Sequence, residues 1–195
     1  MLREALEQGR AASPELLLGD PGDPLIDEDQ PITPAAVLVP IVDRLEPTVI
    51  LTLRPDTLRQ HPGQIAFPGG RIDPGDDGPI GAALREAQEE IGLPPEEVEI
   101  AGIADTYHTI TGYEVTPVLG IVRAGLKLTP QPQEVEAIFE VPLHHILRAE
   151  NQKVRTVEWR GSERSYYEIM WEDRRIWGAT AAMIVNLSRR LALTA

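Results

Sequence analysis

The sequence predicts an α/β (α+β) fold in which a mixed β-sheet lies between helices. Three observations lead to this prediction. Apolar runs rich in β-branched residues recur along the chain at the length of strands. An amphipathic helical pattern follows the third of these runs, and a second one occupies the C-terminal end. Because amphipathic helices occur both between and after the strands in the sequence, we expect helices to cover both faces of the sheet.

The N-terminal part of the chain differs in character from the rest. Residues 1–33 start with a short helical pattern and continue into the loop-like GDPGDPLIDEDQP, so they predict a loosely packed arm. Residues 34–195 contain no shift in composition and predict one further domain. Its first strands are expected at AAVLVPIV, TVILTLR and QIAF, with a hairpin signal, DRLEP, between the first two.

The remaining elements follow the first helix. Strands are expected at VEIAGIADTY, YEVTPVLGIV, VEAIFEVP, KVRTVEW and SYYEIMW. The last two of these read as a hairpin that turns at GSER. In IWGATAAMIVNLSRRLAL, apolar residues recur at helical spacing, which predicts a C-terminal helix packed on the sheet.

The helix between the strands has clear boundary signals. Asp77 or Gly78 can cap its N-terminus, Pro79 suits the first helical position, and Gly92 followed by Pro94 predicts its end. One apolar stripe should face a core and consists of Ile80, Ala83, Leu84, Ala87 and Ile91.

Three glutamates lie in the last two turns of this helix. Glu86 and Glu90 are one turn apart at the edge of the apolar stripe, where like charges repel by roughly 0.2–0.5 kcal/mol. A solvated face, with Arg85 paired to Glu89, explains such a pattern in an arbitrary helix. Here an FPGG segment precedes the helix, and its glycines allow backbone N–H groups to approach anionic oxygens. Carboxylates at this spacing suit Mg²⁺ or Mn²⁺, which predicts metal-assisted phosphate chemistry.

The segment from Gly70 to Leu93 resembles the Nudix box, a glycine, a spaced acidic residue and then REuxEExGu, where u is aliphatic. Arg85 to Leu93 fill the second half of the box, with Ala87 as a small occupant of an aliphatic position. The first half departs from it, because Asp76 replaces the usual glutamate and eight residues, not seven, separate it from Arg85. The resemblance implies a Nudix-type α/β/α sandwich.

A second signature lies upstream of the box. The segment ILTLRPDTLRQHPGQIAFPGGRID resembles LLTxRxxxLxxHxGxxxFPGG of the coenzyme A pyrophosphatase branch. Members of that branch also tend to carry Asp with the extra residue in the box. GYEVTPVLG, EVEAIFEVPL and IWGATA extend the similarity over most of residues 35–190.

The resemblance assigns roles to residues of the box. Glu86 and Glu90 are the first expected metal ligands and Glu89 the next, and the main-chain carbonyl of Gly70 or its neighbour completes the set. Arg85 is expected to orient a ligand glutamate. Asp76 is expected to support the loop or to bind metal through water. The expected catalytic residues are Glu89, Glu134 and Arg85.

The general base is less well defined by the sequence. Nudix enzymes often take a further carboxylate from far downstream, and Glu134 after the turn-like TPQPQ is preferred over Glu136. A solvated glutamate at the end of a strand is an equally good reading of Glu134. Asp105 and His108 are weaker candidates.

The residues expected to bind substrate lie around the glycines. They are Arg54, His61, Phe67, Gly69, Gly70 and Arg71. Phe67 and Tyr113 are aromatic candidates for stacking on adenine, with packing in the core as the alternative for both.

The amino-acid composition limits which kinds of molecule this protein is expected to bind. The net charge of −13, from 18 Lys and Arg against 31 Asp and Glu, disfavours nucleic acid and requires local cations for an anionic substrate. The absence of cysteine excludes thiolate chemistry. No apolar run reaches the roughly 18 residues of a membrane span, so we expect no membrane partner and, by default, a cytoplasmic protein. The sequence does not decide between a monomer and a homodimer.

The implied reaction is the metal-dependent hydrolysis of the diphosphate of coenzyme A, or a derivative, to 4′-phosphopantetheine and adenosine 3′,5′-bisphosphate. The implied partner is therefore a small-molecule nucleotide. One alternative is a Nudix pyrophosphatase for NADH, ADP-ribose or an oxidised dNTP. Another is a non-catalytic nucleotide sensor, which is expected to lose glutamates of the box, although all three are present here.

Overall fold

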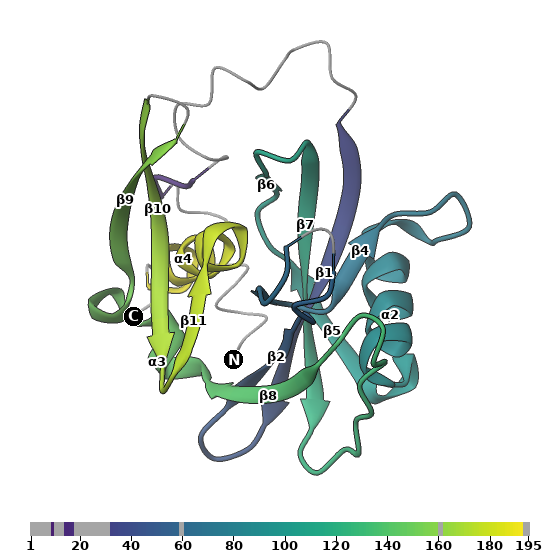
Figure 1. Cartoon of the computed structure of the whole chain (residues 1–195). Coiled ribbons are helices and arrows are strands. Elements are labelled where there is room, and N and C mark those ends of the chain that lie inside the picture. The colour runs from purple at the N-terminus through teal and green to yellow at the C-terminus, as the bar shows by residue number, and fades with distance from the viewer. Residues whose placement is uncertain (1–8, 10–13, 18–31, 59–60, 160–161, 193–195) are drawn as a thin grey trace.

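A mixed sheet forms the centre of the molecule in the computed structural model (Figure 1). The residues that the structure describes are 9, 14–17, 32–58, 61–159 and 162–192, and within them this sheet has eight strands. They are β1 (Thr33–Asp43), β2 (Thr48–Leu53), β3 (Ile65–Ala66), β4 (Gly69–Arg71), β5 (Val98–Ile103), β6 (Tyr107–His108), β7 (Tyr113–Arg123) and β8 (Ala137–Pro142).

The two longest strands of the sheet are parallel to each other. β1 and β7 pair in register from Thr33 opposite Tyr113 to Asp43 opposite Arg123. The main path runs β3-β2-β1-β7-β5, while β4, β6 and β8 pair with β1, β7 and β2. All these other pairings are antiparallel. β1 is a nearly continuous apolar run because both of its faces are covered.

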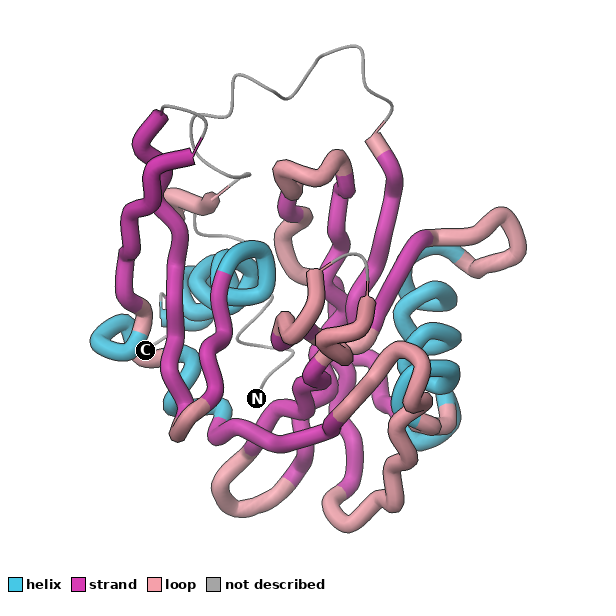
Figure 2. Tube along the Cα trace, in the orientation of Figure 1, coloured by secondary structure: helices cyan, strands magenta, loops and turns pink. Residues whose placement is uncertain are grey.

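A second, antiparallel sheet lies beside the first, in the order β11-β10-β9. Its strands are β9 (Lys153–Trp159), β10 (Ser162–Trp171) and β11 (Arg174–Trp177). The helices are α2 (Gly78–Ile91), α3 (Leu143–Leu147) and α4 (Gly178–Ala192), with 3₁₀ turns at Pro95–Glu97 and Ala149–Asn151. Figure 2 shows α2 and α4 on opposite sides of the main sheet. The mixed α+β fold predicted from the sequence is thus confirmed.

Two apolar clusters hold these layers together. One joins α2 to the main sheet and includes Ala83, Ala87 and Ile91, as the helical stripe predicts. The other fills the space between the main sheet, α4 and the second sheet, and includes Ile169 and Ile184. The main sheet therefore has a distinct α2 face and α4 face, and this difference positions the site.

The predicted boundaries of α2 agree with the structure. The helix starts after Asp77, which occupies the N-cap position without a side-chain hydrogen bond. It ends at Gly92, whose φ of 66° is left-handed and whose N–H donates to the Gln88 carbonyl at 3.0 Å. The N–H of Leu93 donates to the Ala87 carbonyl at 3.3 Å and closes the C-terminal turn.

Four local expectations need correction. Gly69–Arg71, expected as a loop, form β4 because they pair with β1. VEIAGIADTY forms two strands, since Ala104–Thr106 interrupt it. The C-terminal helix begins at Gly178, because Ile176 and Trp177 belong to β11. In GSER, residues 162–164 already belong to β10, and residues 160–161 lie outside the described part of the chain.

The described residues of the N-terminal segment contact α4. The side chain of Asn186 bonds both the N–H and the carbonyl of Leu17, each at 2.8 Å. Arg190 donates to the carbonyl of Gly9 at 2.9 Å, and Gly9 is buried. The expectation of a loose arm otherwise concerns residues 1–8, 10–13 and 18–31, which are outside the described residues. None of the helices in the part of the chain that the structure describes is long and apolar enough to cross a membrane.

Candidate active site

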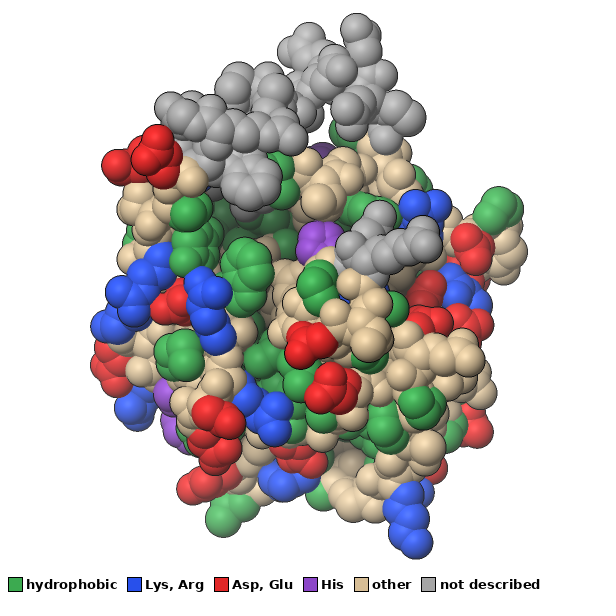
Figure 3. Space-filling model, in the orientation of Figure 1, with side chains coloured by type: hydrophobic (Ala, Val, Ile, Leu, Met, Phe, Trp, Pro, Cys, Tyr) green, Lys and Arg blue, Asp and Glu red, His purple; other side chains and the backbone are tan. Residues whose placement is uncertain are grey.

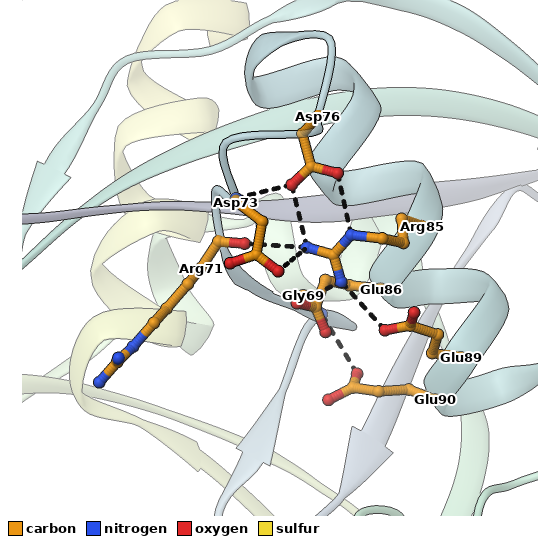
Figure 4. A network of polar contacts seen from close by, with 8 residues as sticks. All are labelled: Gly69, Arg71, Asp73, Asp76, Arg85, Glu86, Glu89 and Glu90. Carbon is orange, nitrogen blue, oxygen red and sulfur yellow. Dashed lines mark hydrogen bonds and ion pairs between the residues drawn. The ribbon is translucent and has the colours of Figure 1, made fainter.

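Arg85, in the middle of α2, is the centre of a polar network that joins the helix to the preceding loop (Figure 4). Its Nε and Nη2 donate to the carboxylate of Asp76 at 2.9 and 3.0 Å. Its Nη1 donates to Glu86 at 2.9 Å and to Glu89 at 3.0 Å, and Nη2 also donates to the main-chain carbonyl of Arg71 at 3.0 Å. A guanidinium has five N–H donors, and these five bonds use all of them. Arg85 therefore has no donor left for a substrate.

The network fixes the loop that precedes the helix. Asp76 accepts from Arg85 and from the N–H of Asp73 at 2.8 Å, and its side chain is only 6% exposed. The Arg85 hydrogen bond lowers the pKa of Asp76, and the same bond raises the pKa of Arg85. Figure 3 shows acidic and basic side chains gathered together near the start of α2. The network includes the i,i+4 pair between Arg85 and Glu89 that the solvated-face alternative predicts.

Glu86 and Glu90 project from α2 toward β4 and are shielded from water. Glu90 is 4% exposed and accepts a hydrogen bond from the N–H of Gly69 at 3.1 Å. Burial, reinforced by the charges of Glu86 and Glu134, raises the pKa of Glu90 to about 7. The Gly69 N–H and the charge of Arg54 oppose this shift. Burial likewise raises the pKa of Glu86, although the bond from Arg85 offsets part of the effect. Such a pair needs a positive partner to be fully ionised at neutral pH.

Gly70 lets β4 approach this pair closely. A Cβ atom placed at Gly70 would overlap the carboxylate of Glu86. Only glycine therefore leaves the Glu86 carboxylate beside the main chain of β4.

Gly70→Ala is expected to lower kcat/KM about tenfold, because the new methyl group displaces the Glu86 carboxylate from its place. The measurement is steady-state hydrolysis over a range of Mg²⁺ concentrations. Gly75→Ala is the matched control, since a Cβ at Gly75 meets nothing within 4 Å. Equal rates for the Gly70 variant and the wild type would show that the position of Glu86 is immaterial.

The donor set fits a divalent cation. Two shielded carboxylates face the main chain of a glycine strand, and burial raises the pKa of both, so a cation bound there would favour their ionised form. Within the described residues, no three acidic or histidine side chains converge on one point. Mg²⁺ is commonly held by one or two carboxylates, with water and substrate phosphates as its other ligands. Glu86 and Glu90 are sufficient for that arrangement.

The loop that carries Glu134 is tied to the C-terminal end of α2. The N–H of Gln131 donates to the carbonyl of Glu90 at 2.8 Å, and that of Thr129 donates to the carbonyl of Ile91 at 3.0 Å. Glu134 is exposed, and its charge raises the pKa values of both Glu86 and Glu90. The structure thus brings this distant glutamate to the box glutamates.

Arg54 follows the end of β2 and supplies positive charge to the same place. Its charge lowers the pKa of Glu90. Its Nε is buried and has no hydrogen-bond partner among the described residues. A buried N–H without a partner is costly, so this atom is a candidate for binding an anionic ligand.

The other predicted residues are placed differently. His61 is exposed, with a left-handed φ of 52°. Phe67 is 3% exposed within the core on the α4 face, which supports packing and not stacking on a base. Asp105 accepts two bonds from Arg190 on α4, at 2.6 and 2.7 Å, so its carboxylate is already engaged. His108 lies 3.5 Å from the carboxylate of Glu114.

Comparison with known proteins agrees with this geometry. The model of the NUDIX domain family matches residues 32–161, which is more than half of the chain. The uncharacterized Nudix hydrolase NudL of Enterobacter sp. (strain 638) is 41% identical over 159 residues, covering 82% of this chain and 83% of that protein. NudL of Cronobacter sakazakii is 43% identical over 157 residues, covering 80% and 82%.

One solved structure of a Nudix hydrolase shares the fold. The Nudix hydrolase RenU of M. smegmatis matches with a TM-score of 0.51 and 24% identity, covering 60% of this chain and 74% of that one. An Ap4A hydrolase of C. elegans, in a binary complex, gives a TM-score of 0.49 at 22% identity, covering 56% and 80%. The extent of the family match and the identity to the NudL proteins are decisive. This chain belongs to the Nudix hydrolase family.

Proposed function

We propose that this protein hydrolyses the diphosphate bond of coenzyme A, or of its derivatives, with Mg²⁺ or Mn²⁺ as cofactor. The products are 4′-phosphopantetheine and adenosine 3′,5′-bisphosphate. Membership of the Nudix family supports pyrophosphatase activity on a nucleoside diphosphate derivative. The choice of coenzyme A depends on the second signature, which contains Arg54, His61 and the FPGG segment.

The position of Arg54 is the observation that carries the proposal. This residue belongs to the upstream signature, and its charge lowers the pKa of Glu90 of the box. Its buried Nε needs an acceptor, which a diphosphate oxygen can supply. This supports a single site to which both signatures contribute, with a cation-binding pair and an arginine for the diphosphate.

The residues of the site then have separate tasks. Glu86 and Glu90 would hold the cation, together with the main-chain carbonyl of Gly70 or its neighbour. When bound, the cation polarises the phosphoryl oxygens and neutralises charge on the leaving group. Arg54 donates to the diphosphate, and Arg85 holds Glu86 and Glu89 in position without touching substrate.

Glu134 is the proposed general base. Its carboxylate is exposed and near Glu86 and Glu90, so it can accept a proton from the attacking water. Glu89 is the alternative, although its bond to Arg85 occupies one of its oxygens.

A substrate panel tests the proposal. With Mg²⁺ or Mn²⁺, coenzyme A is expected to give both products, resolved by liquid chromatography, with a kcat/KM above those of NADH, ADP-ribose and oxidised dNTPs. Acyl and oxidised coenzyme A belong in the same panel. Efficient cleavage of ADP-ribose or NADH without cleavage of coenzyme A would overturn the substrate. Tight binding of a nucleotide without any product, measured by calorimetry in the presence of metal, would favour a sensor.

A further inference from the structure

Glu86 and Glu90 lie on one face of the main sheet, and the side chain of Arg71 points to the other face. In β4, Gly70 faces α2, where it touches Glu86. Successive residues of a strand point to opposite faces, so the side chain of Arg71 points to the α4 face. The register of β4 against β1 supports this orientation of Arg71. Arg71 lies opposite Ala35, and Ala35 belongs to the apolar cluster on the α4 face. Figure 4 shows the Arg71 side chain leading away from the glutamates, while its carbonyl stays in the Arg85 network.

On the α4 face, Arg71 meets one aromatic side chain. Its Nη2 donates to the hydroxyl of Tyr113 at 3.2 Å, and its guanidinium carbon lies 5.7 Å from the centre of the Tyr113 ring. Tyr113 is half-buried at the start of β7, and Arg71 is exposed. Among the described residues, the guanidinium has no other hydrogen bond. It therefore keeps most of its five donors free, unlike Arg85.

Two main-chain groups of β4 are bonded by side chains of α2: the Gly69 N–H donates to Glu90 and the Arg71 carbonyl accepts from Arg85. Within the described part of the sheet, β4 pairs only with β1, so its other edge has no neighbouring strand. Gly70 and Arg71 are consecutive, and their Cα atoms are about 3.8 Å apart. A substrate with its diphosphate at Glu86 and Glu90 would reach the Arg71 guanidinium by passing this strand-free edge.

We propose that Arg71 and Tyr113 form a second anion subsite, which binds the phosphomonoester on the ribose of the substrate. This inference rests on the proposed function, because coenzyme A carries such a group at the ribose 3′ position in addition to its diphosphate. A guanidinium binds phosphate with two parallel hydrogen bonds, and the Tyr113 hydroxyl holds the guanidinium in place. The subsite selects coenzyme A over dephospho-coenzyme A, which lacks the 3′-phosphate.

Kinetics with these two substrates test the subsite. The wild type is expected to prefer coenzyme A, and Arg71→Ala to reduce the ratio of the two kcat/KM values about tenfold, through the loss of charge-assisted hydrogen bonds to the phosphate. Arg71→Lys keeps the charge and should recover part of the ratio. Arg123→Ala is the matched control, because Arg123 is an exposed arginine at the far end of β7. An unchanged ratio in Arg71→Ala, or no preference in the wild type, would overturn the proposal.

A binding measurement separates this inference from the reaction itself. Calorimetry with adenosine 3′,5′-bisphosphate and with AMP needs no turnover. The wild type is expected to bind the bisphosphate more tightly, and Arg71→Ala to remove the difference. If that result holds but coenzyme A is not cleaved, the proposed function fails and the subsite stands. If coenzyme A is cleaved but Arg71→Ala still distinguishes the two ligands as the wild type does, the subsite fails.

Discussion

Glu90→Gln is expected to abolish hydrolysis, with kcat reduced on the order of 10³-fold, while the protein keeps its fold. Glu90 is buried beside Glu86 and faces the glycine strand, so no other described carboxylate can take its place on α2. In the proposed reaction, the cation that Glu90 would help to hold contributes several kcal/mol to stabilisation of the transition state. Glutamine preserves the shape and can still accept a hydrogen bond from Gly69, but it removes the charge.

The same substitution is expected to stabilise the metal-free protein at high pH. The pKa of Glu90 in the folded protein, about 7, lies above its ordinary value of 4.5, so the folded state binds this proton more tightly than the unfolded chain. The free energy of unfolding therefore falls as the pH rises from about 4.5 to about 7, by about 3 kcal/mol, and the penalty is complete above that range. Glu90→Gln removes this penalty.

Both effects can be measured on one pair of proteins. Thermal unfolding in EDTA at pH 5 and at pH 8 should show a higher Tm for Glu90→Gln at pH 8 only. Added Mg²⁺ should raise the Tm of the wild type more than that of the variant. Glu96→Gln provides the control, because it makes the same charge change at an exposed residue just beyond α2. Near wild-type activity in Glu90→Gln would exclude Glu90 from the metal site.

The sequence predicts best where structure is local. The boundaries of α2 depend on Pro79 and Gly92, which act within one turn of their own positions, and the buried stripe depends only on helical spacing. The hairpin of β9 and β10 is similarly local. Glu86 and Glu90 are candidate metal ligands from the sequence because the resemblance assigns these positions to ligands and because their spacing on the helix places both beside this stripe.

The rest of the site depends on contacts between distant segments. β4 has only three residues, two of them glycine, and it forms because β1 offers a partner about 35 residues earlier. The ion pair of Arg85 with Asp76 crosses from the helix to the preceding loop, so helical spacing could not reveal it. The contact of Arg71 with Tyr113 likewise joins residues that are 42 positions apart. Packing, not local pattern, decides these contacts.

Arg85→Ala is expected to lower kcat about 100-fold and to lower the Tm. All five donors of Arg85 bond groups of the protein, so its removal frees Glu86 and Glu89 and leaves Asp76 without its cation. Arg85→Lys keeps the charge but cannot reproduce the fork that bonds Asp76 through two nitrogens, so we expect it to remain well below the wild type.

The pH dependence of this loss identifies its origin. Arg85 lowers the pKa of Asp76 below 3.8, so the stabilisation is fully present above pH 3.8 and is lost as the pH falls through the folded-state pKa. The difference in Tm between wild type and Arg85→Ala should therefore be large at pH 7 and shrink in acid. Because Arg85 has no donor free for substrate, the variant should need more Mg²⁺ while the KM for the substrate changes little. Arg148→Ala, at an exposed arginine paired with Glu150, is the control. A large rise in KM at an unchanged kcat would instead place Arg85 in contact with the substrate.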